Sequence, residues 1–203
     1  MKIYDSDIRK LLIDKFFTTK AFISDTTTKV IHEMDVCTGT SRIDIAVING
    51  KINGYEIKSE QDTLERLPSQ IESYNKVFDT VTIVTGEKYI DKVTNIVPEW
   101  WGIYCVTSQK DRLTLKRKRQ NKINKSIDIL QVTQLLWRDE LLKILALHDI
   151  QKGTKSKTRF ALSEMVVNNI DPQIIKDFVR QALKNRTTWR ADLLQQLYDD
   201  SQQ

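Results

Sequence analysis

The chain has 203 residues, of which 40% are hydrophobic and 29% are charged. This length and balance allow a substantial buried core, so they exclude wholesale disorder and the need for a disulfide or metal to hold the fold. The formal net charge is +5, and no stretch is apolar enough for a membrane span or a signal peptide, so we expect a cytoplasmic protein. The two cysteines, Cys37 and Cys105, are expected to be buried, reduced thiols.

The first part of the chain alternates between helical and strand-like patterns. Apolar residues at helical spacing between Ile8 and Phe16 predict an amphipathic helix, with Asp5 and Ser6 as possible caps. Three strand-like runs follow, at Val30–Cys37, Arg42–Ile48 and Tyr55–Ser59. The pairs Asn49-Gly50 and Asn53-Gly54 indicate a turn, so we expect the last two runs to form a hairpin or a short meander.

The alternation continues to about residue 120. The predicted elements are a helix over Gln70–Phe78 with Pro68 in its first turn, a strand over Val81–Thr85, a helix over Tyr89–Val97, a strand over Trp101–Thr107 and an edge strand over Leu113–Lys118. This order, which begins αβββαβ, predicts an α/β domain over residues 1–120.

From Ile127 onward the pattern is helical only. Leucines at helical spacing, and the cap and first-turn pair Asp171-Pro172, indicate a separate all-helical module over residues 121–203. We expect this module to bind substrate or a protein partner.

Two carboxylates and a lysine are the strongest candidates for catalytic chemistry. Hydrolysis of a phosphodiester needs a divalent cation, a positioned water and a positive charge near the phosphate oxygens. Asp44 has apolar strand neighbours, among which an unpaired carboxylate would be costly. Glu56 and Lys58 are two residues apart in the next strand, so they share one face.

The register of the predicted hairpin decides whether these side chains meet. If Ile48 lies opposite Ile52, with residues 49–51 as a loop that contains a left-handed residue, then Asp44 lies opposite Glu56. A two-residue Asn49-Gly50 turn would instead place Asp44 opposite Tyr55, with Glu56 on the other face unless a bulge intervened. A nuclease site therefore predicts the three-residue loop.

The pattern Asp44…Glu56-Ile57-Lys58, within the order αβββαβ, resembles the PD-(D/E)xK superfamily of nucleases. The resemblance implies a restriction-endonuclease-like core in which Asp44 and Glu56 bind Mg²⁺ or Mn²⁺ and the carbonyl of Ile57 adds a ligand. It also implies that Lys58 orients or activates the attacking water. The stretch from Tyr55-Glu56-Ile57-Lys58-Ser59 to Arg66-Leu67-Pro68, with Pro98-Glu99-Trp100-Trp101-Gly102, is similar to a family of small bacterial and phage proteins assigned to this superfamily.

Further candidates surround this pattern. Gln70 and Tyr74 resemble the Gln-x-x-x-Tyr motif of the RecB-like branch, which implies that both lie beside the metal site; the alternative is a helix that packs Tyr74 against the sheet. Glu33 is a weaker candidate for a third carboxylate, because an exposed strand charge is the commoner case. Arg9 is expected on the exposed surface of the first helix.

A basic cluster follows the last strand-like run. Its residues are Lys116, Arg117, Lys118, Arg119 and Lys122. This density of positive charge suits nucleic acid, and a solvated connector between two domains is an equally good reading of the cluster alone.

Two classes of function therefore compete. The first is a metal-dependent nuclease, with DNA as the expected substrate and Mg²⁺ or Mn²⁺ as the cofactor. The alternative is a non-catalytic nucleic-acid- or protein-binding regulator that keeps the nuclease fold.

Overall fold

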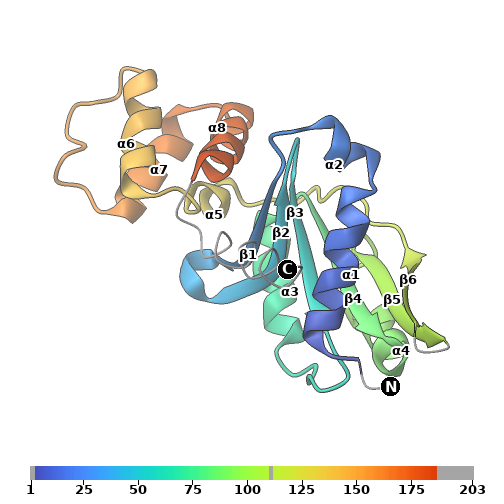
Figure 1. The fold of residues 1–203 in the computed structure, drawn as a ribbon. Coiled ribbons are helices and arrows are strands. Elements are labelled where there is room, and N and C mark those ends of the chain that lie inside the picture. The colour runs from blue at the N-terminus through green and yellow to red at the C-terminus, as the bar shows by residue number, and fades with distance from the viewer. Residues whose placement is uncertain (1–2, 110–111, 187–203) are drawn as a thin grey trace.

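The computed structural model describes residues 3–109 and 112–186 of the chain (Figure 1). Its strands are β1 Lys29–Val36, β2 Ser41–Ile48, β3 Ile52–Lys58, β4 Thr80–Gly86, β5 Gly102–Gln109 and β6 Arg112–Arg119. Its helices are α1 Asp5–Phe17, α2 Lys20–Ser24, α3 Leu67–Val77, α4 Ile90–Ile96, α5 Ile129–Thr133, α6 Arg138–Leu147, α7 Arg159–Asn169 and α8 Pro172–Asn185, with short 3-10 turns η1 Cys37–Gly39 and η2 Glu87–Tyr89. The predicted α/β class and the order of its elements are confirmed.

The strands form one mixed sheet in the order β1-β2-β3-β4-β5-β6. The pairs β3–β4 and β4–β5 are parallel and the other neighbours are antiparallel. A parallel pair needs a crossover, and α3 and α4 supply the two crossovers here. Strand β6 lies at the edge, as its sequence predicts.

Helices cover both faces of this sheet, as Figure 1 shows. On one face, Ile8, Leu12 and Phe16 of α1 pack with Ile45 and Val47 of β2. On the other face, α3 and α4 pack over a larger apolar cluster that contains the fully buried Tyr74, Phe78 and Trp101. The candidate motif on β2 and β3 therefore lies in the part of the sheet between α1 and α3.

The hairpin between β2 and β3 has the register that the nuclease site requires, with Ile48 opposite Ile52. The expected left-handed residue is absent, because the residues with positive φ in the described part lie elsewhere. Instead, the side chain of Asn49 shapes the loop: Asn49 Oδ1 accepts a hydrogen bond from Lys51 N, and Asn49 N donates to Lys51 O, both at 3.1 Å.

Two local predictions were wrong. Asn53-Gly54 is not a turn but part of β3, where a Cβ on Gly54 would lie 3.1 Å from the ring of Phe78, so close packing explains this glycine. Asp5 and Ser6 do not cap α1, because the cap is Tyr4 and Asp5 is already helical. The N–H of Tyr4 donates to Asp7 Oδ2 at 3.0 Å, so a carboxylate one turn further on stabilises the helix start.

Helices α5 to α8 form the predicted all-helical part and contact the sheet near β2 and α3. Asp171 caps α8 as expected, since its Oδ1 accepts a hydrogen bond from Gln173 N at 2.8 Å. Asn124 anchors the connection through hydrogen bonds from Nδ2 to Asn75 O and Phe78 O. Residues 187–203 of the predicted module lie outside the described residues, and the boundary at residue 120 stays a prediction.

No helix in the described ranges combines the length and apolar character that a membrane crossing requires.

Candidate functional site

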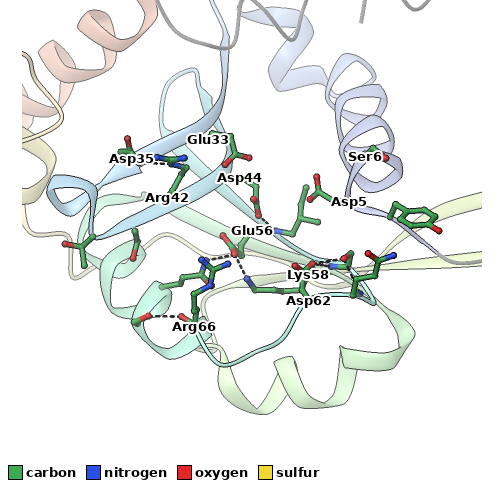
Figure 2. Close-up of a pocket in the computed structure, with 18 of the residues that line it drawn as sticks. Asp5, Ser6, Glu33, Asp35, Arg42, Asp44, Glu56, Lys58, Asp62 and Arg66 are labelled. Carbon is green, nitrogen blue, oxygen red and sulfur yellow. Dashed lines mark hydrogen bonds and ion pairs between the residues drawn. The ribbon is translucent and has the colours of Figure 1, made fainter. Parts of the chain in front are cut away.

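Asp44, Glu56 and Lys58 converge on one pocket beside α1 and α3, as Figure 2 shows. The pocket has a volume of about 710 Å³. Backbone pairing of β2 and β3 runs from Ile48–Ile52 to Ile45–Tyr55, so the next position brings Asp44 opposite Glu56. There the backbone N–H of Ile57 bonds to a side chain of β2 and not to its backbone: Ile57 N donates to Asp44 Oδ2 at 2.6 Å. The hairpin register thus brings the predicted residues together.

Glu56 lies in a buried network that satisfies both of its carboxylate oxygens. Lys58 Nζ and Gln70 Nε2 each donate to Glu56 Oε1 at 2.7 Å. Tyr74 Oη lies 2.8 Å from Glu56 Oε2 and 2.6 Å from Arg42 O, and its single proton can serve either acceptor. Gln70 and Tyr74 therefore fix the orientation of Glu56, and both lie beside the candidate site.

Asp44 has a second strong partner in Arg9 of α1. Arg9 Nη2 lies 3.1 Å from Asp44 Oδ1, and Arg9 Nη1 donates to Asp44 O at 3.0 Å. The same guanidinium binds Asp5 and Glu33, each at 2.5 Å. The expectation of a surface arginine was wrong, since only 19% of the Arg9 side chain is exposed.

The two facing carboxyls have raised pKa values. Burial is the largest cause for Asp44, the charge of Glu56 adds to it, and together they raise the pKa of Asp44 to about 7. Burial also raises the pKa of Glu56, against the opposing effects of Lys58, Tyr74 and Gln70. The protein therefore holds two carboxyls whose ionisation is unfavourable without an additional cation.

The donor set fits a small, hard divalent cation. Asp44, Glu56 and the carbonyl of Ile57 would supply oxygen ligands, and Mg²⁺ in proteins commonly binds one or two carboxylates and keeps several waters. One observation agrees with a cation at this site. Gln70 Oε1 is a buried acceptor without a hydrogen-bond partner, while Nε2 of the same side-chain amide donates to the carboxylate of Glu56. Among the described residues no group of three or more Asp, Glu, His or Cys is placed to hold a metal ion.

Glu33 lies in the pocket wall but points its carboxylate to Arg9. Its backbone has a φ of 52°, which is uncommon outside glycine, and β1 changes the face of its apolar residues at this point. Glu33 thus neutralises the guanidinium that contacts Asp44, and its role as a third ligand stays a prediction.

The predicted basic cluster lies on and just after β6, at the edge of the sheet opposite to β1. Strand geometry alternates its side chains, so Arg117 lies near Tyr104 while Lys116 and Lys118 lie near Cys105. Arg119 is tied to the backbone, because its Nε donates to Trp101 O at 2.8 Å and its Nη2 to Pro98 O at 2.9 Å. Lys122 is exposed beyond the strand. Lys116, Arg117 and Lys118 of the cluster are likewise exposed on β6, while Arg119 also holds the fold.

Sequence reasoning missed two residues of the site. Arg9 enters it from α1, and the acidic first turn of that helix is the only sequence signal for a paired arginine. Asp62 shapes the loop after β3 by accepting hydrogen bonds from Ser59 N at 2.7 Å and Ser59 Oγ at 2.6 Å. Asp62 thus fixes the chain directly after Lys58.

Fold and site together define a mixed α/β protein with a buried Glu-x-Lys pair facing an aspartate. The family model described as Bacteriophage P4 protein cII matches residues 2–201, so the chain belongs to this family. Protein cII of Enterobacteria phage P4 is 27% identical over 177 residues, which cover 87% of this chain and 66% of that protein. The chain thus spans slightly less than two thirds of this relative's length. A solved structure of a protein of unknown function from Silicibacter pomeroyi matches with 14% identity and a TM-score of 0.38, over 64% of this chain and 86% of that one.

Proposed function

We propose that the chain is a metal-dependent nuclease of the PD-(D/E)xK type that hydrolyses phosphodiester bonds, with DNA as its substrate. The observation that carries the proposal is the buried Glu56–Lys58 pair facing Asp44, whose carboxyl has a pKa of about 7 and lines the same pocket.

Each residue of the group has a role in this proposal. Asp44, Glu56 and the carbonyl of Ile57 would hold Mg²⁺ or Mn²⁺, and the cation would neutralise phosphate charge and lower the pKa of a water. Gln70 and Tyr74 hold the Glu56 carboxylate in one orientation through the hydrogen bonds described above. Lys58 keeps a positive charge at the pocket wall, where it would orient the attacking water or a phosphate oxygen.

Arg9 favours the alternative function. A guanidinium on Asp44 Oδ1 places a positive charge beside one of the oxygens that a cation would use, so Arg9 opposes cation binding unless it exchanges this partner while keeping Asp5 and Glu33. A protein in which this exchange never happens would be a non-catalytic nucleic-acid- or protein-binding module with a nuclease fold.

Cleavage and cation binding, measured side by side, separate the two functions. Purified protein is incubated with labelled single- and double-stranded DNA and RNA, with Mg²⁺, Mn²⁺ or a chelator, and the cations are titrated by calorimetry. Lys58→Gln keeps a donor toward Glu56 and should bind the cation without cleaving, whereas Lys51→Gln in the exposed hairpin loop should do both. A wild-type protein that binds no divalent cation, with or without nucleic acid, would contradict the proposal that the chain is an enzyme.

A further inference from the structure

A second groove, of about 560 Å³, adjoins the candidate site. It lies between β1 and η1 on one side and the segment around α5 to α7 on the other. Four residues line both hollows, namely Glu33, Asp35, Gly39 and Arg42. Figure 2 shows Asp35 and Arg42 beside Glu33 and Asp44, so the groove leads directly away from the proposed cleavage site.

Trp137, at the start of α6, lines this groove and presents an unusual aromatic surface. The residue is 48% exposed, although it is large and apolar. The guanidinium of Arg186 lies 4.2 Å from the centroid of the indole ring and covers part of its surface. The exposed remainder of the ring is therefore available for a further stacked group.

The support under Trp137 is rigid. Only 4% of the Arg186 side chain is exposed, and its Nε and Nη2 donate to the two carboxylate oxygens of Glu140 at 2.9 and 2.5 Å. Its Nη2 also donates to Leu135 O at 2.7 Å. Because three hydrogen bonds to Glu140 and Leu135 fix the guanidinium, the indole that packs on it is positioned before any ligand binds.

The charge around the groove suits a polyanion. Glu33 is bound to Arg9 and Asp35 to Arg42 at 2.8 Å, so both acidic side chains of the groove already have a positive partner. Arg159 adds an exposed positive charge to the lining. The adjoining loop holds the exposed Lys152, Lys155 and Lys157, and no acidic residue occurs between Asp149 and Glu164.

We propose that this groove binds single-stranded nucleic acid, with one unpaired base stacked on Trp137 and a phosphate beside Arg159. A duplex hides the faces of its bases within its own stack, whereas an unpaired base can stack on the exposed indole, so the groove favours a single strand. The inference deepens the proposed function, because the bound strand would continue past Arg42 to Asp44 and Glu56.

Binding in a chelator tests the inference without requiring cleavage. The probe is a fluorescent oligothymidylate, with a hairpin duplex of equal charge for comparison, and the readout is anisotropy at several salt concentrations. Trp137→Ala should raise the dissociation constant for the single strand roughly tenfold, equal to about 1.4 kcal/mol. Trp137→Phe should restore most of the affinity, because it keeps an aromatic face. Phe160→Ala, at an equally exposed aromatic outside the groove lining, should leave the affinity unchanged.

A second variant tests the charge independently of the aromatic ring. Arg159→Gln should reduce the slope of log affinity against log salt by about 0.7, the value for one phosphate contact on a single strand. Lys143→Gln, exposed on α6 outside this groove, should not change the slope. Unchanged binding by both Trp137→Ala and Arg159→Gln, or a wild type that prefers the duplex, would overturn the inference. Binding without any cleavage would overturn only the proposed nuclease.

Discussion

Replacing Asp44 with asparagine should stabilise the cation-free protein while removing its activity. In the folded protein the pKa of Asp44 rises from 3.8 to about 7. A raised carboxyl pKa means that the fold is most stable with the group protonated, so this stability is complete below about pH 4 and is lost as the pH rises through 7. Above pH 7 the ionised carboxyl would cost on the order of 4 kcal/mol if nothing else changed.

The asparagine also loses a favourable contact, which reduces the expected gain. Its amide oxygen can still accept the hydrogen bond from Ile57 N, but it cannot form the ion pair with Arg9. We therefore expect Asp44→Asn to raise the free energy of unfolding at pH 8 by about 1–4 kcal/mol, and to change it little at pH 4.

Urea unfolding in a chelator, at intervals from pH 4 to 8, measures this difference. Asp91→Asn, which removes an exposed carboxylate on α4, is the matched control and should show no such pH-dependent gain. Parallel stability curves for wild type and Asp44→Asn across this range would refute the reasoning. Mg²⁺ at about 100 times its dissociation constant should then stabilise the wild type by about 2.7 kcal/mol and the variant by less.

Two further predictions concern Tyr74 and the basic edge strand. Tyr74→Phe removes the hydroxyl beside Glu56 and Arg42 O, so it should lower the free energy of unfolding by about 1–3 kcal/mol. Tyr4→Phe, at an exposed tyrosine, should not lower it. A Tyr74→Phe variant as stable as the wild type would show that the hydroxyl does not support the network. Replacing Lys116, Arg117 and Lys118 with glutamine should flatten the salt dependence of nucleic-acid binding without loss of stability, and Arg119→Gln should lower the melting temperature, because its side chain bonds Trp101 O and Pro98 O. An unchanged slope in the triple variant would mean that β6 is a solvent-exposed edge strand that does not contact phosphate.

The elements and the core of the site followed from sequence because strand periodicity and register are strong constraints. Glu56 and Lys58 had to share a face, and the three-residue loop brings Asp44 opposite Glu56 without a bulge. Trp101, where a strand was expected to begin, is fully buried against Tyr74. Periodicity could not give the details of the loop, where an asparagine side chain replaces the expected left-handed residue.

The contacts that cross between distant elements could not be predicted in the same way. Arg9 reaches Asp44 from a helix 35 residues earlier, and the acidic first turn of α1 is too common a feature to distinguish it from a surface arginine. The run of basic residues on β6 looked uniform, but its alternation in the strand and the hydrogen bonds of Arg119 divide it between two roles. The stacking of Arg186 on Trp137 likewise depends on the end of α8 lying beside the start of α6.

The most direct test of a nuclease centred on Asp44, Glu56 and Lys58 is the rate of Mg²⁺-dependent cleavage of labelled DNA by wild type, Asp44→Asn and Asp91→Asn under identical conditions. Wild type and Asp91→Asn should cleave at similar rates, and Asp44→Asn should not exceed the rate of the wild type in a chelator. Cleavage by Asp44→Asn at the wild-type rate would contradict the proposed site, because an asparagine cannot replace an anionic ligand of Mg²⁺ without a large loss.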